Sequence, residues 1–236
     1  MHPRDDLTLA SYQARAERYA ERTPALGPHL SAYLDSLAAL LPTGATVLEV
    51  GSGPGRAATY LESEHFRVRR TDATPAFVEM MRADGHDARL LDLRTDDLGG
   101  PYDAILALAV LLHLTRREFG TFLHRAHAAI APGGLLAFTM KEGDGSEWST
   151  EKLDLPRHFT YWRERDLRTR MARTGWTPLS ISQVRMNEAW IFVIARSDTP
   201  TTDCAGSSSP LTTTALASQE RFESGPEAGP GPSPDG

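Results

Sequence analysis

The sequence predicts an α/β fold: a doubly wound, seven-stranded, mostly parallel sheet with an antiparallel edge strand and an N-terminal helical lid. Three observations lead to this prediction. Strand and helix patterns alternate between residues 45 and 196, which is typical of a parallel sheet covered on both faces. A glycine-rich turn follows the first apolar run. The last two apolar runs are joined only by Met186-Asn187-Glu188, and so short a link implies an antiparallel hairpin at the sheet edge.

The composition limits the possible classes of protein. With 236 residues, 40% hydrophobic and 24% charged, the chain suffices for one doubly wound domain with appendages. The single cysteine, Cys204, excludes an intramolecular disulfide, so a cytoplasmic location is expected. No apolar run approaches the roughly 20 residues that cross a bilayer, so no membrane association is expected. Residues 197–236 hold six acids and one base, which leaves a near-neutral core that does not indicate nucleic-acid binding.

Residues 1–42 are predicted to form the helical lid. Apolar residues at spacings of three and four predict one helix over residues 8–21 and a second over residues 28–41. Pro42-Thr43-Gly44 ends the second helix.

Residues 43–196 are predicted to form the α/β domain. A capping box at Thr115–Glu118 begins one of its helices, and Gly175 ends the last. The expected strands are 45–50, 66–71, 88–93, 102–109, 135–140, 179–185 and 190–195, and the expected helices are 55–63, 75–83, 115–130 and 163–173.

Residues 197–236 are predicted to be a disordered tail. Ser, Thr, Pro, Gly and Ala dominate this segment, and Phe222 is its only aromatic residue. It therefore lacks the apolar surface needed to offset the entropy of ordering. Cys204 lies within it and is not expected to act as a positioned nucleophile.

The segment Val47–Gly55 carries the clearest chemical signal. An apolar run ends in Glu49 and continues into the GxGxG turn formed by Gly51, Ser52, Gly53, Pro54 and Gly55. The glycines let a ligand approach the main chain. A carboxylate just ahead of the turn suits a cationic ligand and not a phosphate. The dinucleotide fingerprint GxGxxG would require glycine where Arg56 stands, and the chain contains no P-loop sequence.

This pattern resembles motif I of the class I S-adenosylmethionine-dependent methyltransferases, in which an acid lies two positions before GxGxG. Residues 101–106 and 131–134 resemble later motifs of the family. The resemblance implies a Rossmann-like methyltransferase domain over residues 43–196, with S-adenosylmethionine as cofactor and a small molecule as acceptor. Motifs of the nucleic-acid methyltransferases are absent from the sequence.

The ends of the predicted strands give the candidate cofactor residues, because ligands of open α/β sheets bind beyond the carboxyl ends of the strands. Asp72, with Ala73 after it, suits the ribose hydroxyls; alternatively, Asp72 only caps the following turn. Asp92 and Leu93 are placed for the adenine, although Asp92 could instead hydrogen-bond the amides of its own loop. The full cofactor set is Glu49, Gly51, Ser52, Gly53, Gly55, Asp72, Ala73, Asp92, Leu93, Leu108 and Tyr19.

His113 is the candidate catalytic residue. It follows the fourth strand, where similar enzymes often carry a histidine, and an imidazole with a pKa near neutrality suits a general base. The alternative is that His113 hydrogen-bonds its loop and shapes the pocket. The other histidines give no metal site, since His124 and His127 lie one turn apart with no third ligand evident.

The candidate acceptor-binding residues are Lys141, His158, Tyr161 and Tyr12. Tyr12 belongs to the lid, Lys141 ends the fifth strand, and His158 and Tyr161 precede the last helix. We hypothesise that Tyr19 and Tyr161 cover the cofactor or the acceptor. The alternative is an aromatic cluster that only attaches the lid to the core.

The sequence therefore predicts a methyltransferase that acts on an oxygen, nitrogen or carbon atom of a small molecule. Two other functions remain open: a protein methyltransferase, and a non-catalytic module that binds S-adenosylmethionine. The sequence makes no prediction of oligomeric state.

Overall fold

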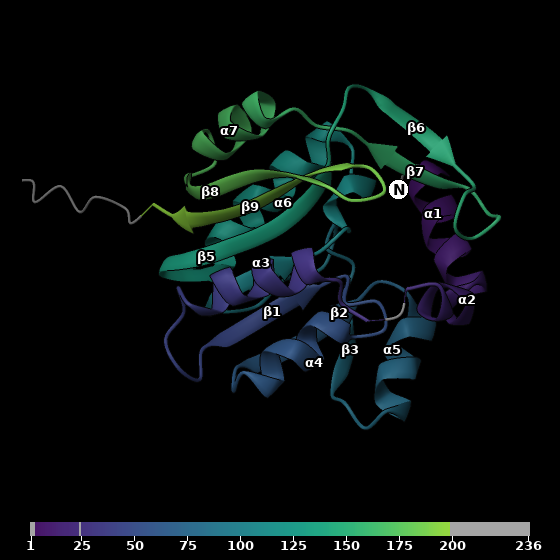
Figure 1. Cartoon of the computed structure of the whole chain (residues 1–236), viewed down its shortest axis with the longest axis horizontal. Helices are drawn as coiled ribbons and strands as arrows, with labels where there is room; N and C mark the ends of the chain where they lie inside the picture. Colours follow the sequence, from purple (N-terminus) through teal and green to yellow (C-terminus); the bar gives the residue numbers. More distant parts are fainter. Residues whose placement is uncertain (1–2, 24, 199–236) are drawn as a thin grey trace, which may run out of the picture. The chain divides into compact units, whose positions relative to one another are not determined.

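The computed structural model describes residues 3–23 and 25–198 (Figure 1). The helices are α1 (Pro3–Ala14), α2 (Ala16–Glu21), α3 (Pro28–Ala38), α4 (Arg56–Ser63), α5 (Pro75–Ala83), α6 (Arg116–Ala129) and α7 (Glu164–Ala172), with a short 3₁₀ turn, η1 (Leu111–His113). The strands are β1 (Thr46–Val50), β2 (Arg67–Asp72), β3 (Ala88–Leu90), β4 (Tyr102–Ala107), β5 (Ile130–Lys141), β6 (Ser146–Ser149), β7 (Arg157–Thr160), β8 (Trp176–Arg185) and β9 (Ala189–Ser197).

Seven strands form one sheet in the order β3-β2-β1-β4-β5-β9-β8. The strands β3, β2, β1, β4 and β5 pair in parallel, while β9 is antiparallel to both of its neighbours. The β8–β9 hairpin closes one edge, as predicted. The chain order reverses between β1 and β4, and this switch point is where open α/β sheets bind ligands.

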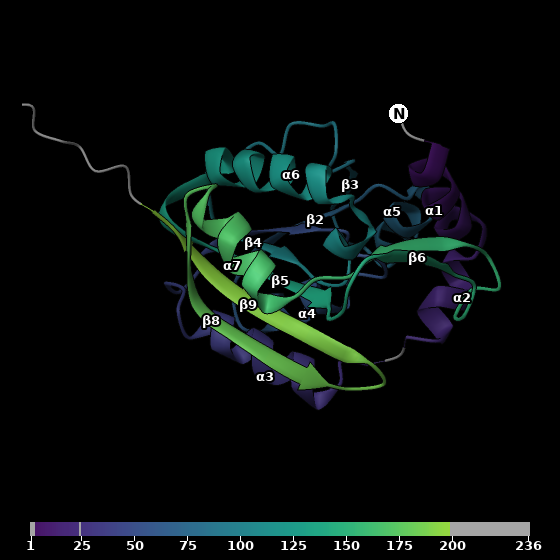
Figure 2. The same ribbon diagram turned by 90° about the horizontal axis from the view of Figure 1, so that it is seen from above.

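Helices cover both faces of the sheet, and strand residues alternate between the two layers. On β1, Val47 faces the cluster that contains α3 and α4, whereas Leu48 and Val50 face the cluster that contains α6 and α7. Figures 1 and 2 show α3 and α6 on opposite sides of the sheet. The near-continuous apolar strands are explained by this burial on both faces.

The predicted boundaries agree closely with the structure in the glycine-loop half of the domain. Helix α5 begins and ends at the predicted residues, and the capping box of α6 forms, with Glu118 N donating to Thr115 Oγ1. The strand predicted over 88–93 is shorter, since β3 ends at Leu90. The strand predicted over 135–140 is longer, because β5 already begins at Ile130.

The N-terminal region differs from the prediction. The helix expected over residues 8–21 is two helices, because the backbone leaves the helical region at Arg15. Helix α3 packs into the core through Tyr33, Leu34 and Leu37. A lid role over residues 1–42 therefore stays a prediction, and it concerns α1 and α2 rather than α3. The predicted tail begins too early by at least one residue, because Ser197 ends β9. Residues 199–236, including Cys204, lie outside the described residues.

The prediction missed a second sheet, formed by the antiparallel strands β6 and β7. Helix α1 packs against it, with Ser11 Oγ donating to the carbonyl of Pro156 at 2.7 Å and His158 N donating to Thr8 Oγ1 at 3.0 Å. Figures 1 and 2 show this small sheet beside α1. Strands of four residues give too short a pattern to be recognised from the sequence alone.

Within the described part of the chain, no helix is long and apolar enough to span a membrane.

One buried hydroxyl attaches α3 to the antiparallel part of the sheet. Tyr33 Oη donates to the carbonyl of Val193 at 2.6 Å and lies 3.2 Å from that of Phe138. Replacing Tyr33 with Phe should lower the free energy of unfolding by about 1–2 kcal/mol, since both carbonyls lose a partner. Tyr60→Phe is the matched control, because its hydroxyl bonds Asp35 at the surface, and it should cost less than about 0.5 kcal/mol. Denaturant unfolding measures both, and equal losses would contradict the assignment.

Candidate functional site

Two adjoining cavities lie where β1, β2 and β4 end. The smaller is enclosed mainly by apolar side chains and by the loops after β2 and β3. The larger has a volume of about 820 Å³ and extends toward β7 and the β8–β9 turn. They share one wall, formed by Tyr12, Tyr19, Gly51, Gly53, Leu108, Ala109 and His113.

The glycine loop after β1 lines both cavities through Gly51 and Gly53 and the larger one also through Ser52, whereas Gly55 lines neither, contrary to expectation. Gly51 has a φ of +68°, and a Cβ there would lie 2.5 Å from Val110 Cγ2. Gly55 has a φ of +81°, and its Cβ would meet Arg70 Nη1 at 2.4 Å. Both positions therefore require glycine. Ser52 holds the loop to β2, since its amide donates to the carbonyl of Thr71 at 2.9 Å.

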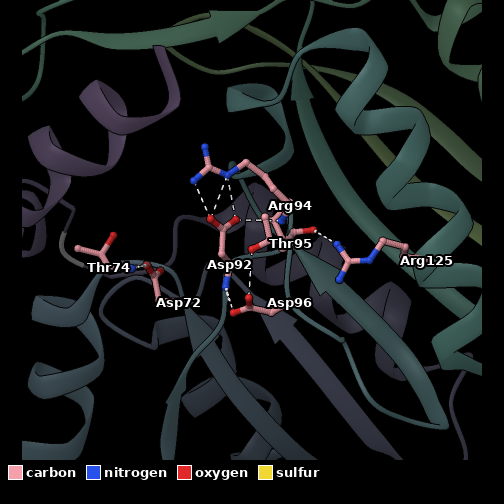
Figure 3. Close-up of polar contacts among 8 residues, drawn as sticks. Asp72, Thr74, Asp92, Arg94, Thr95, Asp96 and Arg125 are labelled. Carbon is pink, nitrogen blue, oxygen red and sulfur yellow. Dashed lines mark hydrogen bonds and ion pairs between the residues drawn. The ribbon is translucent and has the colours of Figure 1, made fainter. Parts of the chain in front are cut away.

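Asp72 joins the loops that follow β1 and β2. Its Oδ2 accepts the Gly53 amide at 2.8 Å. Its Oδ1 accepts the Thr74 amide at 2.8 Å (Figure 3). Burial raises the pKa of Asp72, although these backbone donors act against the shift. The side chain also lines the smaller cavity. Asp72 thus caps its turn, which was the alternative interpretation. Its carboxylate oxygens retain lone pairs that a ribose could use, and the ribose role stays a prediction.

Asp92 is held by its own loop. Its carboxylate accepts the Arg94 amide at 2.9 Å and pairs with the Arg94 guanidinium, with an Nη2–Oδ2 distance of 2.6 Å (Figure 3). Burial acts to raise the pKa of Asp92, but the Arg94 hydrogen bonds and charge outweigh it and lower the pKa. Asp92 still lines the smaller cavity, so its adenine role stays a prediction. The structure contains the interaction of the alternative interpretation, in which Asp92 hydrogen-bonds an amide of its own loop.

Four further predicted cofactor residues line the smaller cavity. Ala73, Leu93 and Leu108 line it, each from a different strand end. Tyr19 enters from α2, and its ring lies 5.5 Å from that of Phe77 on α5, a residue that sequence reasoning missed. Phe77 lies on the apolar face of its helix, and this pattern alone does not separate a core residue from a cavity residue.

Glu49 is the buried acid of the larger cavity. The residue is 2% exposed, and its Oε2 atom has no hydrogen-bond partner among the described residues. Burial raises the pKa of Glu49 to about 7. A buried carboxylate with an unused acceptor is costly unless a ligand pairs with it. Glu49 is therefore placed to bind a cationic or hydrogen-bond-donating group.

His113 is held at both ring nitrogens. Its Nδ1 lies 2.6 Å from the carbonyl oxygen of His158, and its Nε2 lies 2.9 Å from Tyr12 Oη. A carbonyl can only accept, so Nδ1 carries the proton and Nε2 accepts from the tyrosine. Burial lowers the pKa of His113 from 6.5 to about 3. The geometry favours the second interpretation, a neutral imidazole that shapes the pocket, over a general base.

Two of the predicted acceptor residues lie in the larger cavity. Lys141 ends β5 and pairs with Glu188 at 2.7 Å, and its Nζ atom lies 4.0 Å from the centre of the Phe159 ring. Tyr12 lies on the wall common to both cavities. Both positions agree with the expected placement, while the binding of an acceptor stays a prediction.

His158 and Tyr161 line neither cavity, contrary to expectation. The His158 ring packs at 5.3 Å from Trp148, its partner on β6, and the Tyr161 hydroxyl hydrogen-bonds Glu147. Side chains alternate along β7, so Arg157 and Phe159 face the cavity and His158 does not. Tyr161 follows the end of β7, and this alternation does not account for its position. Sequence reasoning missed β7, and it therefore could not tell which side chains of this strand face the cavity.

Comparisons with known proteins agree with this architecture. A family model for the methyltransferase domain matches residues 17–181. None of the curated proteins compared by sequence matches the chain. Among solved structures, 1,6-didemethyltoxoflavin-N1-methyltransferase of Burkholderia thailandensis was crystallised with 1,6-didemethyltoxoflavin and S-adenosylhomocysteine. It is 20% identical with a TM-score of 0.62, and the match covers 84% of this chain and 91% of that chain.

Two further structures show the same fold. DhpI, crystallised with SAH, is 24% identical with a TM-score of 0.67, and the match covers 84% of this chain and 98% of that chain. Magnesium protoporphyrin IX methyltransferase of Synechocystis, also with bound SAH, is 15% identical with a TM-score of 0.61, over 83% and 98%. The predicted family and fold class are confirmed.

The environment of His113 predicts its titration. Between pH 5 and 8 its imidazole chemical shifts in NMR spectra should not change, because the folded protein takes up this proton only near pH 3. The unfolded chain binds the proton near pH 6.5, so His113 should lower the free energy of unfolding as the pH falls from 6.5 toward 3. His113→Asn assigns the signal. A midpoint near 6.5 in the folded protein would restore the general-base interpretation.

Proposed function

The chain belongs to the methyltransferase-domain family, and we propose that it transfers a methyl group from S-adenosylmethionine to a small molecule bound in the larger cavity. One observation carries the proposal: the two cavities share a wall at the switch point of the sheet. The cavities adjoin at these shared residues, so two ligands, one in each cavity, would meet beside Tyr12, Leu108 and His113. Methyl transfer requires such a meeting, since the donor carbon and the acceptor atom must lie in line.

The residues present fit the cofactor. Phe77, Leu93 and Leu108 provide apolar walls for the adenine, and Asp72 provides a buried carboxylate for the ribose hydroxyls. Glu49, with its unpartnered Oε2, would face the cationic methionine end, and the open backbone at Gly51 and Gly53 permits close approach. When bound, S-adenosylmethionine supplies an electrophilic methyl group on an already activated leaving group.

The protein's own contribution is alignment and exclusion of water. Tyr12 and Tyr19 cover the shared wall from the N-terminal helices, and Phe159 covers the larger cavity from β7. His113 remains neutral and occupied by Tyr12, so the site favours acceptor atoms with an available lone pair over those that need a strong base. The small-molecule acceptors named for the solved structures, such as 1,6-didemethyltoxoflavin, support a metabolite as acceptor here.

Calorimetric titration tests the cofactor site. The protein should bind S-adenosylmethionine and S-adenosylhomocysteine, and Asp72→Ala should weaken both by about tenfold or more, since a buried acceptor of charge-assisted hydrogen bonds is lost. Asp84→Ala, at an exposed acid just after α5, is the matched control. Methyl transfer from labelled cofactor to a low-molecular-weight extract then supports the proposal. Transfer only to proteins, or binding without transfer, would replace it with a protein methyltransferase or a non-catalytic binding module.

Glu49 predicts a pH dependence of cofactor affinity. Its carboxyl has a pKa of about 7, and a cationic ligand favours the ionised form, so affinity for S-adenosylmethionine should rise between pH 6 and 7.5. In Glu49→Gln the affinity should be lower and should change little over this interval. A wild-type affinity that is flat or falls with pH would contradict the assigned role.

A further inference from the structure

We propose that the acceptor carries an oxyanion, a carboxylate or a phosphate-type group, and that Arg157 binds it together with Lys152. This inference rests on the proposed function and narrows its acceptor to a chemical class. It follows from the charges of the larger cavity, from the burial of Arg157 and from the position of that residue relative to the glycine loop.

Cations in the larger cavity outnumber the acids that could neutralise them. Its charged lining residues are Arg22, Glu49, Arg56, Lys141, Glu151, Lys152, Arg157 and Glu188. Lys141 is neutralised by Glu188, and the exposed Arg22 donates to the backbone carbonyl of Lys152. Within residues 3–23 and 25–198, neither Arg56, Lys152 nor Arg157 forms an ion pair. The cavity therefore holds three cations outside any ion pair, and its two other acids are Glu49, whose charge acts on Arg56, and Glu151.

Arg157 is the most buried of these three cations. The residue is 6% exposed, and its Nε atom has no hydrogen-bond partner in the part of the chain that the structure describes. Its Nη1 donates to Tyr12 Oη at 3.3 Å, and its guanidinium lies 5.1 Å from the Phe159 ring centre. A guanidinium buried among aromatic rings without a carboxylate is costly, and an oxyanion that accepts two of its N–H groups would offset that cost.

Lys152 is the second cation of the proposed site. Its Nζ lies 4.2 Å from the centre of the Tyr19 ring, so it is held over the wall that the two cavities share. Burial, followed by the charges of Arg157 and Arg56, lowers the pKa of Lys152 to about 8. A bound anion would relieve this repulsion, and it would therefore favour the charged form of the lysine.

The position of Arg157 assigns it to the acceptor rather than to the cofactor. It projects from β7 beside Tyr12 and Phe159 and does not line the smaller cavity. Arg56 begins α4 directly after the glycine loop, so it is the cation available to the cofactor's own carboxylate. The alternation of β7 explains why a basic residue and an aromatic residue both face the acceptor cavity.

The test uses the full chain saturated with S-adenosylhomocysteine and titrated with inorganic phosphate or with benzoate at constant ionic strength. Saturable binding of at least one probe below about 10 mM is expected, and the stronger probe distinguishes a phosphate-type group from a carboxylate. Arg157→Met should weaken the binding of this probe by about tenfold or more, and Arg157→Lys should weaken it less. Lys152→Met should also weaken the binding of the probe. Arg117→Gln, at an exposed arginine of α6, is the control.

Each outcome separates this inference from the function on which it rests. S-adenosylhomocysteine affinity should be unchanged in Arg157→Met, which also shows that the variant is folded. Binding of the nucleoside without either anion, or anion binding that survives both Arg157→Met and Lys152→Met, overturns the inference and leaves the methyltransferase proposal intact. Loss of nucleoside binding in Arg157→Met would assign the arginine to the cofactor instead. Failure of the wild type to bind the nucleoside would overturn the proposed function itself.

Discussion

The organisation of the site depends on one buried carboxylate that joins two loops. Asp72 accepts an amide from the glycine loop after β1 and another from the turn after β2. Its burial makes the ionised form costly, and the two backbone donors compensate for part of that cost. The loops therefore keep a fixed separation at the switch point of the sheet. The smaller cavity lies beside this junction, and Asp72, Gly53 and Thr74 all line it.

A second polar chain fixes the N-terminal region over this edge of the sheet. It runs from Arg157 on β7 to Tyr12 on α1, then to His113 in η1, and returns to β7 at the carbonyl of His158. Each member is constrained by its neighbour, since a carbonyl at one end dictates the histidine tautomer and hence the direction of the tyrosine hydroxyl. The chain makes α1 a wall of the site, and it explains why the histidine contributes shape and not proton transfer.

The glycine-loop side and the β7 side of the site differ in charge, and this difference suits the two ligands of a group transfer. The glycine-loop side presents Asp72 and Glu49, buried acids that match a cationic nucleoside. The β7 side presents Arg157 and Lys152, which match an anionic partner. Because both sides are partly removed from water, each sign of charge is felt more strongly there than it would be at the surface. Opposite charges at adjoining sites favour the arrangement in which donor and acceptor face each other in one orientation.

The sequence by itself determined the fold class, the glycine loop, the parallel strands and the hairpin that closes the sheet. These are local properties, because apolar runs, helix caps and turn residues act over a few positions. Glu49, Asp72, Leu93 and Leu108 could be found for the same reason, since the residue after every parallel strand lies at the same edge of the sheet.

Only the tertiary structure decided what those residues touch. It paired Asp92 with Arg94, and it neutralised His113 between a tyrosine and a carbonyl. It also formed the β6–β7 sheet, whose register turned His158 away and Arg157 inward. These contacts depend on burial and on pairing between segments up to about 150 residues apart in the sequence, and a pattern of a few neighbouring residues cannot predict them.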